Sequence, residues 1–173
     1  MSAAPLTLET LAAMLPLKAR LIGVDLGTKT IGLALSDVER RIATPLTTLA
    51  RTRFTRDAEA LSEQIRKFEA VALVLGLPLN MDGGEGQRVQ ATRAFARNFS
   101  RLDATPIVLW DERLSTAAVN RAMIEADLSR ARRAEVVDRA AAAYILQGAL
   151  DRLARIPRAA ADRETPIKNS SGD

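Results

Sequence analysis

Short apolar runs alternate along this chain with segments whose apolar residues recur at helical spacing. The runs at 20–26, 71–77 and 106–110 read as buried strands, the first apolar on both faces as in the middle of a sheet. Two more strands are predicted at 30–36 and 41–49, and their short connections make them antiparallel neighbours. Helical periodicity marks the segments around 58–68, 87–102, 115–126 and 132–153.

The predicted order of elements, β-β-β-α-β-α-β-α-α, defines the fold class. An antiparallel meander is followed by helix–strand alternation, which implies parallel crossovers. We therefore expect an α/β fold with a mixed five-stranded sheet flanked by helices, the order found in the ribonuclease H-like fold. Residues 1–17 are expected to form an N-terminal extension, residues 18–156 the folded domain and residues 157–173 a flexible C-terminal tail.

Composition narrows the chemistry. The chain of 173 residues contains neither cysteine nor histidine, which excludes Cys and His nucleophiles, a His general base and His- or Cys-ligated zinc. Oxygen ligands remain, and these suit Mg²⁺ or Mn²⁺. No apolar run approaches the ~20 residues of a membrane span, and no export signal is apparent, so we expect a cytoplasmic protein without membrane contact.

Charge favours a polyanionic partner, because the net charge is +4 and the pI is about 10.1. Many basic proteins bind no nucleic acid, so charge alone does not decide this point. Aromatic residues make up only 3% of the chain. Any recognition of nucleic acid should therefore use shape and phosphate contacts rather than base stacking.

Asp25 is the first acid whose position needs an explanation. It lies near the end of an apolar strand predicted to be central, where a carboxylate is costly unless it is paired or bound to metal. A turn-capping role is the alternative. The apolar flanks and the following Gly27, which permits close approach of a phosphate, favour a functional site.

Two further positions supply acids. Asp111 and Glu112 follow the strand at 106–110, although an ordinary solvated strand end with an ion pair to Arg113 explains them equally well. Asp138 lies on an apolar stripe of the last helix, although a favourable charge near a helix N-terminus is a sufficient reason for it. Two-metal phosphodiester cleavage needs several carboxylates and no histidine, so together the acids suggest such a site.

Four motifs in a fixed order resemble those of the YqgF family, Holliday-junction-resolvase-like enzymes described as nucleases that mature the 5′ end of 16S rRNA. They cover about residues 20–151, and all four in order are far more specific than any one. The matching segments are Gly23-Val24-Asp25-Leu26-Gly27-Thr28-Lys29-Thr30-Ile31-Gly32, Gly76-Leu77-Pro78-Leu79-Asn80-Met81-Asp82-Gly83, Asp111-Glu112-Arg113-Leu114-Ser115-Thr116 and Val137-Asp138 with the alanines and Ile145-Leu146 that follow.

The resemblance implies a ribonuclease H-like nuclease with Mg²⁺ or Mn²⁺ as cofactor. It also implies that Asp25, Glu112 and Asp138 match the family's metal-binding catalytic acids, whereas the role of Asp111 stays open. Arg139 departs from the small polar residue that many members carry there. It would either pair with the neighbouring carboxylate or face the substrate.

Candidate substrate-binding residues lie around these acids. A phosphate could bind at the first turn, at the glycine-rich loop that precedes a helix, at a helix N-cap or along the basic start of the last helix. For the glycine-rich loop the alternative is plain flexibility, and for the basic helix start it is an ordinary solvated surface. The candidates are Lys29, Asn80, Arg113, Ser115, Arg132 and Arg133.

The sequence leaves several functions open. The leading prediction is a nuclease for pre-16S rRNA in ribosome biogenesis, and the alternatives are a Holliday-junction resolvase on branched DNA and a non-catalytic ribosome-assembly factor. The first motif also resembles a phosphate motif of actin-like ATPases and sugar kinases, but the chain has room for only one such domain and shows no second phosphate motif. A monomer and a dimer both remain possible, with Leu8, Leu11 and Leu15 as the candidate seam.

Overall fold

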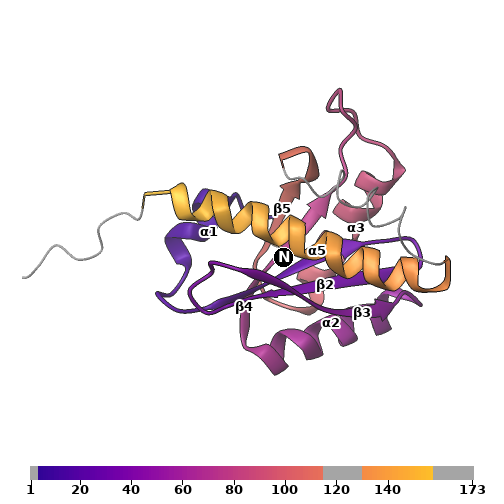
Figure 1. Cartoon of the computed structure of the whole chain (residues 1–173), viewed down its shortest axis with the longest axis horizontal. Helices are drawn as coiled ribbons and strands as arrows, with labels where there is room; N and C mark the ends of the chain where they lie inside the picture. The colour runs from indigo at the N-terminus through magenta and orange to yellow at the C-terminus, as the bar shows by residue number, and fades with distance from the viewer. Residues whose placement is uncertain (1–3, 115–129, 158–173) are drawn as a thin grey trace, which may run out of the picture.

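A computed structural model describes residues 4–114 and 130–157 of the chain (Figure 1). The elements in chain order are α1 (Leu8–Met14), β1 (Arg20–Leu26), β2 (Thr30–Ser36), β3 (Ala43–Ala50), α2 (Phe54–Phe68), β4 (Ala70–Leu77), α3 (Gln87–Leu102), β5 (Ile107–Asp111), the 3-10 turn η1 (Glu112–Leu114) and α5 (Arg130–Arg155). The strands form one five-stranded sheet in the order β3-β2-β1-β4-β5. β1 and β3 run antiparallel to β2, whereas β4 runs parallel to β1 and to β5. The predicted mixed sheet is confirmed.

Helices cover both faces of the sheet, so the molecule has three layers. Ile22 and Val24 of β1 contribute to the core beneath α2 and α3, whereas Leu21 belongs to the core beneath α5. This alternation follows from the period of two along a strand and explains why β1 is apolar on both faces. Figure 1 shows α5 crossing the sheet as one long helix.

α5 approaches the sheet unusually closely because small residues face each other. A Cβ on Gly23 of β1 would lie 2.6 Å from the Cβ of Leu146 and 2.7 Å from the carbonyl oxygen of Ala142. The glycine and the alanine-rich helix together let the two backbones approach each other. Side chains on the inner face of this part of α5 are consequently held against the centre of the sheet.

The extension at the N-terminus contributes α1 to the core beneath α5. The helix begins after Thr7, whose hydroxyl oxygen accepts a hydrogen bond from the amide of Thr10 at 3.1 Å. Leu8 and Leu11 are buried and Leu15 packs against the same core. These leucines face the chain's own interior, so they do not form the exposed dimer seam that the sequence allowed.

Most predicted boundaries hold to within two residues, but α2 begins at Phe54 rather than near residue 58. The starts of β3 and α5 differ from the prediction for identifiable reasons. β3 begins at Ala43 rather than at residue 41, because the amides of Arg41 and Ile42 donate to Asp37 Oδ1 at 2.7 and 2.9 Å in a turn. α5 begins at Arg130, which places Asp138 two turns into the helix rather than one. The helix predicted at 115–126 lies outside the described residues.

Among the described helices, none has the length and apolar character needed to cross a bilayer.

Candidate active site

Asp25 lies at the centre of the sheet and is only 2% exposed. It pairs directly with Gly32 of β2, so the two residues occupy the same face. On the other side, the pairing of β1 with β4 runs to Val24 and Leu75, and Gly76 is the next residue of β4. A buried carboxylate thus has a glycine on each neighbouring strand.

The space above Gly32 is filled by the main chain of Asp138. A Cβ on Gly32 would collide with the carbonyl group of Asp138 and would lie 2.6 Å from the amide nitrogen of Arg139. Because Gly32 and Asp25 share a face, this contact also shows that Asp25 faces α5.

The side chain of Asp138 points toward the β1–β2 turn. Its Oδ2 accepts a hydrogen bond from the hydroxyl of Thr30, and it would lie 3.1 Å from a Cβ on Gly27. Thr30 therefore fixes the direction of this carboxylate. Arg139 is half-buried, and within the described part of the chain it forms no ion pair with Asp138.

Glu112 occupies the space above the other glycine. It is the first residue of η1, directly after β5, and is 5% exposed. Its Oε1 would lie 2.6 Å from a Cβ on Gly76, and the end of the Ile145 side chain from α5 shares that space. The Glu112 carboxylate is thus held over β4, on the face that carries Asp25.

The three predicted acids therefore lie on one face of the sheet and come from three different elements. Neighbouring strands are about 4.8 Å apart, which places the Asp138 main chain and the Glu112 carboxylate about one strand spacing to either side of Asp25. Within residues 4–114 and 130–157, no three acidic side chains form a ready-made metal-binding cluster. The donors at the site are nevertheless all oxygen, the type that Mg²⁺ and Mn²⁺ prefer.

Asp111 has a different partner from these acids. Both its carboxylate oxygens accept hydrogen bonds from the Arg113 guanidinium, with Nη2 to Oδ2 at 2.7 Å and Nε to Oδ1 at 3.0 Å, and Oδ1 also accepts from the Arg113 amide. The hydrogen bonds from Arg113 hold the pKa of Asp111 below its ordinary value. The ion-pair alternative is therefore correct for Asp111, whereas the adjacent Glu112 is buried.

The loop after β4 borders this ion pair. Its turn is closed by hydrogen bonds from the amide of Gly83 to the carbonyl of Asn80 at 2.8 Å and from the amide of Asn80 to the carbonyl of Gly84 at 3.1 Å. Gly83 has a φ of +84°, which favours glycine, and a Cβ there would lie 3.4 Å from Nη1 of Arg113. Asn80 and Arg113 thus belong to one rim of the site.

The remaining substrate-binding candidates are distributed unevenly. Lys29 is exposed in the β1–β2 turn, beside the Thr30 hydroxyl that holds Asp138. Arg132 and Arg133 belong to the first turn of α5. Ser115 lies outside the described residues.

Several residues that build this site were not among the predicted candidates. Gly32 and Gly76 make room for the acids, and a glycine inside an apolar strand is a recognised signal of close approach. Thr30 orients Asp138, and Arg51 donates a hydrogen bond from Nη1 to the carbonyl of Gly27 at 2.6 Å. Neither polar contact has a signal in a single sequence, because each joins residues far apart in the chain.

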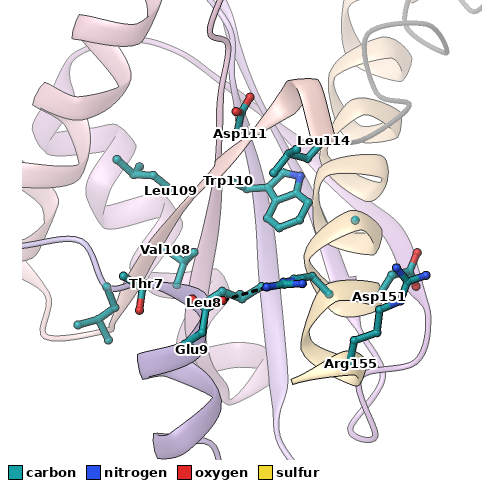
Figure 2. A pocket seen from close by; sticks show the side chains of 13 residues that line it. Thr7, Leu8, Glu9, Val108, Leu109, Trp110, Asp111, Leu114, Asp151 and Arg155 are labelled. Atoms are coloured by element: carbon teal, nitrogen blue, oxygen red, sulfur yellow. Dashed lines mark hydrogen bonds and ion pairs between the residues drawn. The ribbon is translucent and has the colours of Figure 1, made fainter. Parts of the chain in front are cut away.

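A separate cavity of about 750 Å³ lies between α1, β5 and the end of α5 (Figure 2). Its apolar wall includes Leu8, Val108 and Trp110, and an ion pair between Glu9 and Arg152 at 3.4 Å lies beside it. The indole nitrogen of Trp110 is buried with no hydrogen-bond acceptor among the described residues. The three central acids do not line this cavity.

Comparisons with known proteins identify the family of this chain. A family model described as RuvX, Holliday junction resolvase, matches residues 19–152. A protein of Methylocella silvestris is 64% identical over 156 residues, covering 90% of this chain and 97% of the relative, and one of Agrobacterium fabrum is 55% identical over 157 residues, covering 91% and 99%. Both carry the provisional name pre-16S rRNA nuclease.

A solved structure shares the fold at much lower identity. T. thermophilus RuvC, in complex with a Holliday junction substrate, matches with a TM-score of 0.50 and 15% identity, covering 78% of this chain and 96% of that one. The likeness confirms the ribonuclease H-like fold. Since the family model spans most of the folded chain, and since relatives more than half identical align over nearly their whole length, the chain belongs to the RuvX (YqgF) family, as its four motifs indicated.

Proposed function

We propose that this chain is a divalent-metal-dependent nuclease that processes the 5′ end of pre-16S rRNA during ribosome biogenesis in the cytoplasm. The main support is the position of Asp25, a buried carboxylate whose two neighbouring strands carry glycines with Asp138 and Glu112 above them. A carboxylate at this buried position costs stability that an apolar residue would not cost, so the arrangement favours function over stability. The RNA substrate is inferred from the names of the relatives.

The proposed metal ligands are Asp25, Glu112 and Asp138. Carboxylates from a strand, a strand end and a helix offer only oxygen donors, which fits Mg²⁺ or Mn²⁺. When bound, divalent ions supply an activated water and charge stabilisation at the leaving oxygen. The hydrogen bond from Thr30 prepares Asp138 by fixing its orientation before substrate arrives.

Residues around the acids are proposed to hold the substrate backbone. Lys29 approaches from the β1–β2 turn, and Asn80 and Arg113 from the opposite rim. With Asp111 engaging Nε and Nη2 of Arg113, Nη1 remains beside the Gly83 loop and is placed to donate to a phosphate oxygen. Ser115, Arg132 and Arg133 remain proposed phosphate contacts on the grounds of sequence alone.

A second candidate function is resolution of branched DNA, which the description of the matching family favours. A resolvase cuts two symmetry-related strands, so this candidate predicts a symmetric dimer in solution. The RNA nuclease makes no such demand.

One experiment separates these functions. The purified full chain is incubated with a 5′-extended 16S rRNA precursor fragment or a four-way DNA junction, in Mg²⁺, Mn²⁺ or EDTA. Asp25→Asn and Glu112→Gln are the test variants, and Asp151→Asn, at an exposed position far along α5, is the matched control. Loss of several kcal/mol of transition-state stabilisation should slow cleavage at least about 100-fold in each test variant.

Metal-dependent cleavage of the RNA alone, retained in the control, is the expected result. Cleavage of the junction alone would replace the RNA nuclease with the resolvase. If neither substrate is cut in any metal while the RNA is still bound, the proposed nuclease is wrong and a non-catalytic assembly factor takes its place.

A further inference from the structure

Four basic residues occupy the β1–β2 turn, the connection from β3 to α2 and the first turn of α2, and three of them lie outside the motifs that indicated the candidate site. Lys29 belongs to the β1–β2 turn, Arg51 directly follows β3, Arg53 directly precedes α2, and Arg56 lies in the first turn of α2. We refer to these four residues as the basic track.

The track begins next to the acids. Arg51 donates from its amide to the carbonyl of Lys29 at 2.8 Å and from Nη1 to the carbonyl of Gly27 at 2.6 Å. Gly27 is also the residue whose Cβ would lie 3.1 Å from Oδ2 of Asp138. Arg51 therefore ties the end of β3 to the turn beside the candidate active site and fixes where the track starts.

The acids near the track form no ion pair with its exposed residues in the part of the chain that the structure describes. Lys29, Arg53 and Arg56 are exposed, and none of them forms an ion pair there. Asp57, the acid in the first turn of α2, is buried and accepts hydrogen bonds from the amide and hydroxyl of Thr52 at 2.9 and 3.0 Å. The four cations outnumber the two acids of this segment, Asp57 and Glu59, so the local charge stays positive on a backbone that these hydrogen bonds hold in place.

The track suits phosphates rather than bases. Phe54 lies between Arg53 and Arg56 in the chain, and its ring packs edge-on against Phe95 of α3 with centroids 5.5 Å apart, so it is not available for stacking on a base. Arg and Lys side chains on a short segment instead match a flexible polyanion. Residues 51–53 span at most about 10 Å, so their side chains can contact neighbouring phosphates of one RNA strand.

We propose that Lys29, Arg51, Arg53 and Arg56 bind the phosphate backbone of the single-stranded RNA that flanks the cleavage point, leading it from the acids toward the start of α2. The proposal rests on the proposed function, because it takes the nuclease substrate as its ligand. It adds the path that the flanking strand follows and the residues that hold it.

The test is the salt dependence of RNA binding, measured in EDTA so that no cleavage occurs. The dissociation constant of the full chain for the 5′-extended precursor fragment is obtained by fluorescence anisotropy at several KCl concentrations. The test variant is Arg53→Gln with Arg56→Gln. The matched control is Lys18→Gln with Arg101→Gln, which removes the same charge at the opposite end of the sheet, where β1 begins and α3 ends.

Removing one cationic partner of a single-strand phosphate should lower the slope of log K against log salt by about 0.7, so the test variant should lose about 1.4 and bind roughly tenfold more weakly. The control should keep the wild-type slope. With a fragment lacking the flanking strand, the test variant and the control should bind alike. Equal losses in both variants, or an unchanged slope in the test variant, would overturn the track.

The two proposals fail separately. A reduced slope in the test variant together with no metal-dependent cleavage by the wild type would leave the track standing and remove the nuclease. Metal-dependent cleavage together with an unchanged slope would keep the nuclease and remove the track. Because the two substituted arginines are exposed, urea unfolding of each variant should match the wild type and exclude misfolding as the cause.

Discussion

The main chain of Asp138 lies where a side chain on Gly32 would have to go. Gly32 pairs with Asp25 across the β1–β2 ladder, so this one contact sets how closely the acid on α5 approaches the acid on β1. The colliding atoms belong to backbone, which cannot rotate away as the end of a long side chain can. The relationship between Gly32 and Asp138 therefore concerns stability and site geometry at once.

Gly32→Ala is expected to destabilise the fold by about 1–3 kcal/mol or more, because α5 must move off the sheet to admit the methyl group. Gly86→Ala is the matched control, since a Cβ there meets nothing within 4 Å and the position tolerates a side chain. The control should cost less than about 1 kcal/mol, mainly through its N-cap position. Urea unfolding measures both, and equal stability of the two variants would show that α5 does not rest on Gly32.

Gly76→Ala should separate stability from activity. The added Cβ would meet the ends of two side chains, Ile145 and Glu112, and both can shift. We expect an unfolding cost of about 1 kcal/mol, smaller than for Gly32→Ala. Displacing Glu112 by about 1 Å should nevertheless lower precursor cleavage about 100-fold. Cleavage at the wild-type rate in a variant that unfolds normally would remove Glu112 from the catalytic set.

The sheet was predictable from sequence because its strands are buried. The runs at 20–26 and 30–36 carry enough apolar residues to define both strands to the residue. The start of β3 was not predictable, because it depends on hydrogen bonds to one carboxylate oxygen of Asp37 in the preceding turn. Burial pattern fixes strands, whereas local polar contacts decide where they begin.

The site was predictable only in part. Asp25 and Glu112 are conspicuous because they interrupt or end apolar strands, and the structure buries both. The bond from Thr30 to Asp138 joins residues 108 positions apart, and nothing in one sequence pairs them. Chemistry-bearing residues can thus be identified from composition and position, but the residues that orient them emerge only with the fold.

Thr30→Val tests whether that bond orients Asp138. The substitution keeps the shape of the side chain and removes the hydroxyl that donates to Oδ2. Loss of a residue that orients a metal ligand typically costs 10–100-fold in activity, so kcat for precursor cleavage should fall by about that factor. RNA affinity in EDTA should not change, since the hydroxyl is committed to Asp138.

Thr30→Ser is the rescue control because it restores the hydroxyl. Cleavage by the serine variant should lie within about threefold of the wild type, above the range expected when the hydrogen bond is absent. If the valine and serine variants are equally slow, the threonine methyl group rather than its hydrogen bond supports the site.

Arg113→Gln should lower the free energy of unfolding by an amount that the wild type itself loses in acid. Hydrogen bonds from Arg113 lower the pKa of Asp111 in the folded chain below the ordinary value of 3.8. A carboxyl whose folded pKa is lowered stabilises the fold in full above its unfolded pKa and loses that contribution as the pH falls through the folded pKa.

Wild type should therefore exceed Arg113→Gln in unfolding free energy by a constant amount near neutral pH, and the difference should shrink below pH 3.8. Urea titrations from pH 7 to about pH 3 measure this difference, and Asp111→Asn with Arg113→Gln should also lose the smaller pH dependence that the amide of residue 113, which still donates to Asp111 Oδ1 in the single variant, leaves in place. A difference that persists undiminished in acid would show that Arg113 stabilises the fold through its contact with the Gly83 loop and not through Asp111.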